Sequence, residues 1–374
     1  MTNLTQKLAE NLLNQADIKI NGNHPWDVKV NNNNVFDRIA QKGSLGLGES
    51  YMDGWWDAEK LDEFLFRGIS ANLDKQVKIQ RDWKALLFIA GQVALNHQTK
   101  KAARKVGEKH YDLGNDLFKA MLDQRMVYTC GYWKDADNLD QAQENKLDLV
   151  CKKLKLQPGQ KILDIGCGWG SFAKFAAERY GVNVVGVTIS QEQVELGQKL
   201  CAGLPVKIIN QDYRDVQGEY DHIVSLGMFE HVGYKNYHTY MKTVAKHLKP
   251  GGFFLLHTIG SIRTVKVNDT WLDKYIFPNS MLPSIAQIGQ ATENIFIMED
   301  WHNFGADYDK TLMAWFDNFE KAWPELAPKY SERFYRMWKF FLLACAAGFR
   351  ARKIELWQII FSKEGVPGGY QSVR

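Results

Sequence analysis

The sequence KILDIGCGWG, from Lys161 to Gly170, decides the expected fold of this chain. Ile162 and Leu163 precede Asp164 and Ile165 follows it, and three glycines then come at alternate positions: Gly166, Gly168 and Gly170. A helix-like run over 171–180 follows at once. A strand that ends in a glycine turn and opens a helix lets backbone N–H groups face an anionic ligand.

The glycine spacing indicates which ligand the turn is built for. Dinucleotide enzymes use a related but wider spacing. The tighter pattern here resembles the first motif of S-adenosylmethionine-dependent methyltransferases, although an ordinary strand-to-helix turn can also produce so short a match. The resemblance implies that S-adenosylmethionine contacts the following residues of the stretch: Asp164, Gly166, Cys167, Gly168 and Gly170.

From residue 110 onward the chain alternates between strand and helix patterns. We expect strands at 161–165, 182–187, 206–209, 221–225 and 252–258, with helices between them. This order predicts an α/β fold with a doubly wound, Rossmann-like sheet of the class I methyltransferase kind. A long insertion to about 300 follows, and a last strand pair at 296–300 and 355–362 closes the sheet. Ligand sites in such sheets lie at the carboxyl ends of the strands.

The first 109 residues have a different texture. An amphipathic helix over 2–16, short strands at 18–20 and 28–30, and helices over 61–67 and 83–94 predict a small mixed α/β domain at 1–95. A linker at 96–109 then joins it to a catalytic domain at 110–374. The segment from Asp74 to Lys109 contains nine basic residues and three acidic ones. This excess predicts either a solvated helix face or attraction to anionic lipid headgroups.

Composition excludes several classes of protein. The net charge of +4 is too small to indicate a nucleic-acid-binding protein. The five cysteines are scattered without a CxxC pair, which favours a reducing compartment and neither a disulfide framework nor a metal site. The longest apolar runs, 85–95 and 340–349, are shorter than the roughly 18–20 residues that span a bilayer. We therefore expect a cytoplasmic protein that lies, at most, on a membrane.

Two groups of polar residues follow the second and third strands. Where many nucleotide-binding sheets place an acidic residue for the ribose, this chain has Thr188, Ile189 and Ser190, with Gln193 one turn later. An amide can replace the carboxylate as a neutral hydrogen-bonding group. After the third strand come three residues placed for adenine: Asp212, Tyr213 and Arg214. Taken in order, both groups favour the same cofactor.

Four further stretches carry residues suited to chemistry: YTCGYW at 128–133, GMFEHVG at 227–233, the strand end with His257 and Ile259, and Tyr308 after the insertion. These residues resemble the cyclopropane-fatty-acyl-phospholipid synthases and the related mycolic acid cyclopropane synthases. The resemblance covers nearly the whole chain, through LGLGESYMDGWW, HYDLGNDLF, LDIGCGWG, GVTISQEQ and the C-terminal FRARKIELWQIIFSK. It implies further cofactor contacts from Tyr128, Thr129 and Gly227.

The family implies methylene transfer from S-adenosylmethionine to a cis double bond of a phospholipid acyl chain. Attack of the alkene on the sulfonium methyl leaves a carbocation, which must lose a proton before the three-membered ring closes. Such a site must exclude water, stabilise positive charge with aromatic faces, and hold a base near the methyl group.

The resemblance identifies that base as bound bicarbonate. The residues that match the family's bicarbonate site are Cys130, Glu230, His257, Ile259 and Tyr308. A shared proton between the bicarbonate O–H and the Glu230 carboxylate relieves the repulsion of two anions. The cysteine that matches Cys345 also carries an active-site label in the family. We expect no covalent role there, because an alkene offers a thiolate no acyl or phosphoryl group.

The partners implied by the resemblance are a bilayer with unsaturated acyl chains, at the inner face of the membrane, and a second copy in a homodimer. The alternatives are a class I methyltransferase that acts on a small-molecule amine or oxygen, and a non-enzymatic lipid-binding protein. Nucleic-acid methylation is disfavoured, because the catalytic part has no strongly basic face.

Overall fold

The computed structural model describes residues 2–73 and 114–374, and these residues form two compact units. The N-terminal unit comprises 2–73, 267–278 and 312–354, and the sheet unit comprises 114–266, 279–311 and 355–374. The expected helix at 83–94 and the basic linker at 96–109 lie outside the described residues. The domain boundaries at 95 and 110 stay a prediction; the contact-based units also place two later segments with the N-terminal residues.

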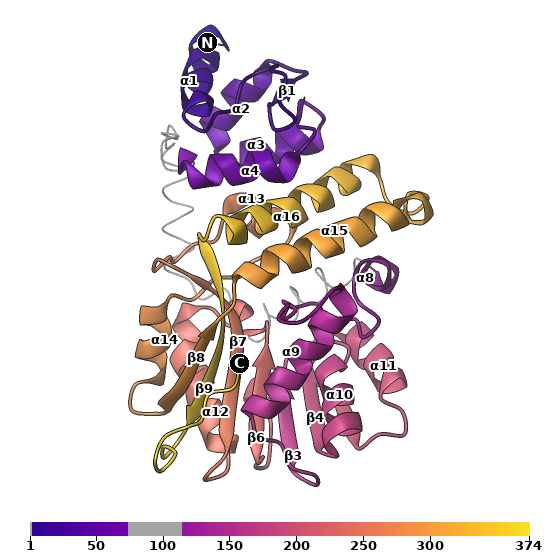
Figure 1. Cartoon of the computed structure of the whole chain (residues 1–374), viewed down its shortest axis with the longest axis vertical. Coiled ribbons are helices and arrows are strands. Elements are labelled where there is room, and N and C mark those ends of the chain that lie inside the picture. The colour runs from indigo at the N-terminus through magenta and orange to yellow at the C-terminus, as the bar shows by residue number, and fades with distance from the viewer. Residues whose placement is uncertain (1, 74–113) are drawn as a thin grey trace. The chain divides into compact units, whose positions relative to one another are not determined.

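The N-terminal unit is built mainly from helices (Figure 1). They are α1 (Thr2–Asn14), α2 (Asn34–Lys42), α3 (Ser44–Met52), α4 (Leu61–Ser70), α13 (Thr270–Tyr275) and α16 (Glu332–Arg350), together with the C-terminal part of α15 (Ala306–Leu326). Strands β1 (Lys29–Val30) and β2 (Trp56–Asp57) pair antiparallel. The strand expected at 18–20 is reduced to one bridge, from Ile20 to Val28.

The glycine-rich stretch 43–56 contains the helix α3, and its glycines serve close packing. A Cβ at Gly46 would lie 2.3 Å from the Arg38 carbonyl oxygen, and one at Gly48 would lie 2.4 Å from the Trp271 ring. Helix α3 therefore approaches α2 and α13 more closely than any side chain would permit. Sequence periodicity did not reveal this helix, because the contact face consists of glycine rather than apolar side chains.

Buried Glu49 on α3 joins the first segment of this unit to its later segment, 267–278. Its carboxylate accepts hydrogen bonds from Arg38 at 2.9 Å, Lys274 at 2.6 Å and the Tyr275 hydroxyl at 3.0 Å. Burial opposes ionisation, but these donors outweigh it and lower the Glu49 pKa to about 2. The segment that contains α13 is thus fixed to α3 by an ionised, buried carboxylate.

The sheet unit contains a seven-stranded sheet in the order β5-β4-β3-β6-β7-β9-β8 (Figure 1). The strands are β3 (Lys161–Ile165), β4 (Asn183–Thr188), β5 (Val206–Asn210), β6 (His222–Leu226), β7 (Phe253–Ser261), β8 (Ile297–Asn303) and β9 (Ile354–Ser362). Strands β3 to β7 pair parallel in this order, and β8 pairs antiparallel with β9. The predicted α/β sheet and its closing strand pair are confirmed.

Helices and short 3-10 turns connect these strands. The helices are α8 (Asn115–Met121), α9 (Leu139–Lys153), α10 (Ser171–Tyr180), α11 (Gln191–Leu200), α12 (Tyr237–His247) and α14 (Ile285–Thr292), and α15 begins in this unit. The turns are η1 (Tyr213–Asp215), η2 (Phe229–His231) and η3 (Tyr234–Asn236). The expected insertion after β7 thus contains α13 and α14. Among the described residues, none of the helices is both long and apolar enough to cross a bilayer.

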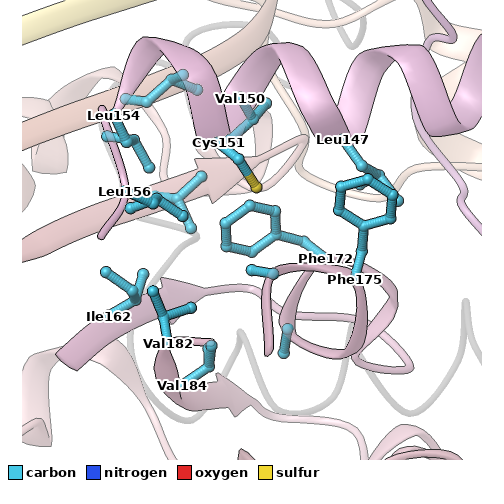
Figure 2. Packing of buried hydrophobic residues seen from close by; sticks show 14 of the residues in the cluster. Leu147, Val150, Cys151, Leu154, Leu156, Ile162, Phe172, Phe175, Val182 and Val184 are labelled. Atoms are coloured by element: carbon cyan, nitrogen blue, oxygen red, sulfur yellow. The ribbon is translucent and has the colours of Figure 1, made fainter. Parts of the chain in front are cut away.

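Strand residues alternate between two hydrophobic cores, one on each face of the sheet. Ile162, Val224 and Leu255 pack with α9 and α10, as Figure 2 shows for Ile162 and the α9 and α10 side chains. Their neighbours Ile223 and Phe254 belong instead to the core that contains α12 and α14. Side chains of a strand point alternately to opposite faces, so apolar residues at consecutive positions fill both cores.

Gly166 ends β3 with a positive φ of 81°, and a Cβ there would lie 2.6 Å from the Met228 Cβ. We predict that Gly166→Ala lowers the free energy of unfolding by about 2–4 kcal/mol, because backbone strain and overpacking add. The matched control is Gly159→Ala, where φ is 82° with open space around the Cβ, and where only the strain of about 1 kcal/mol is expected. Equal losses in chemical denaturation would contradict the proposed contact.

Candidate functional site

The carboxyl ends of β3 and β4 present the residues expected to bind the cofactor. Asp164 is fully buried in β3, and burial raises its pKa to about 7 although the charge of Lys146 acts against this. The Thr188 hydroxyl donates to the Gln193 amide oxygen at 2.7 Å, and Ser190 caps α11. Gln193 therefore keeps its amide nitrogen as the donor for a ligand. Ile189 lies half-buried between these two polar residues.

The three residues after β5 are organised around an internal ion pair. Arg214 binds both carboxylate oxygens of Asp212, at 2.7 and 2.6 Å, and its guanidinium lies 5.3 Å from the Tyr213 ring centroid. Tyr213 in turn packs against Tyr240 of α12. The bidentate pair occupies the Asp212 carboxylate, so Tyr213 is the member of the trio with an aromatic face for stacking.

Two buried polar side chains of α9 hold the loop that contains Thr129. Gln143 donates to the Thr129 carbonyl oxygen at 2.8 Å, and the Lys146 ammonium donates to the Thr129 hydroxyl at 2.8 Å. Both side chains are fully buried, and burial lowers the Lys146 pKa to about 8. The Thr129 methyl group would lie 2.7 Å from a Cβ at Gly227, so this loop is pressed against the end of β6.

The next part of the loop contacts the start of α15. Thr311 accepts hydrogen bonds from the Gly131 N–H at 3.1 Å and the Trp133 indole at 2.9 Å, and Asp307 accepts from the Trp133 backbone. Cys130 lies 3.9 Å from the Thr311 hydroxyl, and burial raises its thiol pKa well above the usual value. Tyr308 lies between Asp307 and Thr311 on the same helix turn. Cys130 and Tyr308 are therefore brought to one region, with the cysteine as a neutral thiol.

Glu230 is a buried carboxyl group that is fixed at one oxygen. The Ile259 N–H donates to its Oε1 at 2.7 Å, which joins the turn η2 to β7. The other oxygen, Oε2, is buried without a hydrogen-bond partner among the described residues. Burial raises the Glu230 pKa to about 7, although the hydrogen bond from Ile259 lowers it. The backbone N–H of Ile259 thus holds the carboxylate, and its expected contact with an anion stays a prediction.

His257 lies two residues before Ile259 on β7. The Gln358 amide nitrogen, on β9, lies 3.3 Å from His257 Nδ1. With the amide placed in this way its nitrogen donates to Nδ1, which corresponds to the tautomer with the ring proton on Nε2. This Nε2 is buried and without a partner among the described residues. Burial lowers the pKa of His257 well below its usual value, so the ring is neutral.

Two site atoms, His257 Nε2 and Glu230 Oε2, thus lack a hydrogen-bond partner among the described residues, and Gln358 Oε1 beside His257 lacks one as well. Buried polar groups are normally hydrogen-bonded, so the two atoms indicate a missing small polar ligand. Bicarbonate fits this pair, since it has an O–H to donate and oxygens to accept. Cys345 lies on α16 in the N-terminal unit, where burial raises its thiol pKa to about 12. Neither thiol is activated as a nucleophile.

The sequence pattern did not identify several residues that position this site: Gln143, Lys146, Asp307, Thr311 and Gln358. Four of them are fully buried polar side chains. The signal that could have revealed them is a polar residue at a core position of an expected helix or strand. Lys146, for example, lies one helical turn before buried Val150 on α9. Such a residue is buried only where it has a specific partner.

The raised pKa of Glu230 predicts a pH-dependent stability. Below pH 4.5 the group is protonated in both the folded and the unfolded chain. As the pH rises toward 7 only the unfolded chain releases this proton, so the folded state loses up to about 3 kcal/mol. In bicarbonate-free buffer, Glu230→Gln should remove this loss. Urea denaturation between pH 5 and 8 measures it, with exposed Glu219→Gln as the control. Parallel curves for the wild type and Glu230→Gln would contradict the assignment.

Comparisons with known proteins agree with the geometry. The sequence profile described as "Mycolic acid cyclopropane synthetase" matches residues 97–359. The cyclopropane-fatty-acyl-phospholipid synthase of Escherichia coli K12 is 56% identical over 368 residues, which are 98% of this chain and 96% of that protein. A probable fatty acid methyltransferase of Pseudomonas putida is 37% identical over 69% of each chain.

Solved structures of similar proteins show the same fold. The cyclopropane synthase MmaA2 of Mycobacterium tuberculosis is 30% identical, with a TM-score of 0.66 over 70% of this chain and 98% of that one. The mycolic acid cyclopropane synthase CmaA1, solved with SAH and CTAB, is 32% identical at the same TM-score and the same coverage of both chains. Coclaurine N-methyltransferase, at 20% identity and a TM-score of 0.69, supports the fold alone.

Proposed function

Because this chain belongs to the mycolic acid cyclopropane synthetase family, we propose that it is an S-adenosylmethionine-dependent cyclopropane-fatty-acyl-phospholipid synthase. It transfers a methylene group to the cis double bond of an unsaturated phospholipid acyl chain. The observation that carries the proposal is that Glu230 Oε2 and His257 Nε2 are buried and have no hydrogen-bond partner within the part of the chain that the structure describes. A methyltransferase acting on an amine or a hydroxyl would also use a base, for the N–H or O–H proton of its substrate, and the 56% identity to a cyclopropane-fatty-acyl-phospholipid synthase favours the lipid reaction.

The cofactor contacts follow the carboxyl edge of the sheet. S-adenosylmethionine, when bound, supplies the electrophilic methyl group. The Gly166 turn, with backbone N–H groups before α10, and the buried Asp164 form one side of the cofactor site. Gln193 offers an amide donor and Tyr213 an aromatic face on the other. Thr129, held by Gln143 and Lys146, closes the site from the α9 side.

The same residues keep the reaction dry and direct its proton. Cys130, Glu230 and His257 are almost completely inaccessible, which protects a developing carbocation on the lipid from water. Tyr308 provides an aromatic ring that stabilises positive charge. The neutral state of Cys130 matters as well, because a thiolate here would trap the cation instead of tolerating it.

Bicarbonate is the ligand that we assign to the unpartnered pair. His257 Nε2–H would hold one of its oxygens, and Glu230 Oε2 would accept its O–H. When bound, bicarbonate would supply the base that takes up the proton of the transferred methyl group. A Glu230 pKa of about 7 suits this arrangement, since a proton is readily shared between two groups of similar basicity.

The substrate places the enzyme at a lipid surface. Because the acyl chains of phospholipids are assembled in bilayers, we propose that the protein associates peripherally with the inner face of the membrane. From the resemblance to its family, we also propose that it functions as a homodimer. Activity on anionic vesicles should fall as salt rises, since screening weakens contacts of basic residues with headgroups. Salt-independent activity would contradict this part of the proposal.

Replacement of Glu230 by Gln tests the catalytic assignment. The amide keeps the shape and the hydrogen bond from Ile259 but removes the acidic group. We expect turnover to fall about 100-fold or more, with the affinity for S-adenosylmethionine unchanged. The assay is mass spectrometry of vesicle lipids, where each unsaturated chain gains one CH2 and no polar group. Glu219→Gln, on an exposed residue, should retain full turnover, and normal activity of Glu230→Gln would refute the role.

Removal of bicarbonate tests the ligand. In buffer purged of carbon dioxide, turnover of the wild type should fall at least tenfold and return when bicarbonate is added. The Glu230→Gln variant should respond only weakly, because its anion site is damaged. If purged and supplemented buffers give equal rates with the wild-type enzyme, another base is responsible and the pair at the end of β7 has a different ligand.

A further inference from the structure

Exposed apolar side chains gather on the segments just beyond the end of β7. Ser261, the last residue of β7, forms a parallel bridge with Ser284, and the Thr264 and Ser284 hydroxyls lie 2.8 Å apart. Both serines are buried. Their successors Ile262 and Ile285 therefore turn outward, with 54% and 59% of their surfaces exposed. Val265 is also exposed, at 38%.

Basic side chains accompany these apolar ones. Arg263 and Lys266 are exposed on the same segment as Ile262, and exposed Lys235 lies on η3. The ammonium groups of Lys235 and Lys266 are each 5.8 Å from the centroid of the Tyr234 ring, which brings η3 and the segment after β7 together. The residues 233–237, 260–266 and 282–292 contain neither Asp nor Glu. These three segments therefore combine exposed apolar residues with charges that are all positive.

All three segments begin beside the candidate catalytic residues. The turn η3 follows η2, which carries Glu230. Strand β7 carries Ile259, whose N–H donates to Glu230 Oε1, and the Met281 N–H donates to the Glu230 backbone carbonyl oxygen at 2.8 Å. The apolar and basic residues thus lie on segments that continue from residues in contact with Glu230 or next to it in the chain.

We propose that Ile262, Val265 and Ile285, with Lys235, Arg263 and Lys266, form a docking surface for an anionic phospholipid bilayer. The aliphatic side chains enter the boundary between headgroups and acyl chains, while the cations contact lipid phosphates. The inference deepens the proposed function, because it sets the bilayer against the segments through which an acyl chain reaches Glu230. It differs from the basic linker at 96–109 in its place in the sequence and in combining apolar with cationic residues.

Charge favours a bilayer over a protein partner. A protein interface that buries three cations needs carboxylates at matching positions, whereas a bilayer of anionic lipids supplies phosphates wherever a cation lies. The exposed side chains of Ile262 and Ile285 also suit a fluid apolar phase such as a bilayer, which needs no shaped pocket to receive them.

Two double variants test the surface by sedimentation with vesicles of unsaturated phosphatidylglycerol and phosphatidylcholine. Ile262→Ser/Ile285→Ser removes apolar contacts, and Arg263→Gln/Lys266→Gln removes two charges. Each should weaken vesicle binding of the full-length protein about tenfold or more, the charge variant only at low salt. The control Leu200→Ser/Ile297→Ser removes exposed apolar side chains elsewhere on the sheet unit and should bind as the wild type does.

Activity measurements separate this proposal from the enzymatic one. With the same lipid dispersed in detergent micelles, both variants should produce cyclopropane chains at the wild-type rate, and on vesicles they should be slower. Wild-type binding to vesicles by both variants would overturn the docking surface, whatever their activity. Weaker binding by the variants, together with no CH2 gain by any form of the protein, would keep the docking surface and refute the proposed reaction.

Discussion

The hydrogen bond from the Ile259 backbone to Glu230 Oε1 is the constraint on which the candidate site depends. It joins a 3-10 turn after β6 to the neighbouring strand β7, and so fixes a carboxyl group that the turn alone would leave free to rotate. With one oxygen held, the other has a defined direction in a buried region. His257, two residues earlier on the same strand, adds a second buried polar side chain whose Nε2 has no hydrogen-bond partner among the described residues.

Burial determines the protonation states of this region more than charge pairing does. It raises the pKa values of Glu230, Asp164 and Cys130 and lowers those of His257 and Lys146. Every shift favours the neutral form, as expected for groups that lose water without gaining a full counter-charge. A buried site of this kind is suited to chemistry in which a cation develops on a hydrocarbon, because water is excluded and the Cys130 thiol is held protonated.

The sheet could be predicted from the sequence, whereas several supporting contacts could not. The strand at 161–165 was bounded correctly because an apolar run ending in a glycine turn has few alternative structures. Helix α3 was missed, since its contact face is glycine and the fit depends on Arg38 and Trp271, which are distant in sequence. Among site residues, Glu230 and His257 were found through resemblance to a family. Gln358 and Lys146 were not found in this way, because they are recognised as site residues only by their contacts with His257 and Thr129, which lie on other elements.

The most direct test of the account is a crystal structure of the protein with S-adenosylhomocysteine, grown with bicarbonate. The account predicts a planar anion within hydrogen-bond distance of both Glu230 Oε2 and His257 Nε2, with Gln358 donating to His257 Nδ1. A structure in which Glu230 and His257 point away from one another, with open water between them, would contradict it.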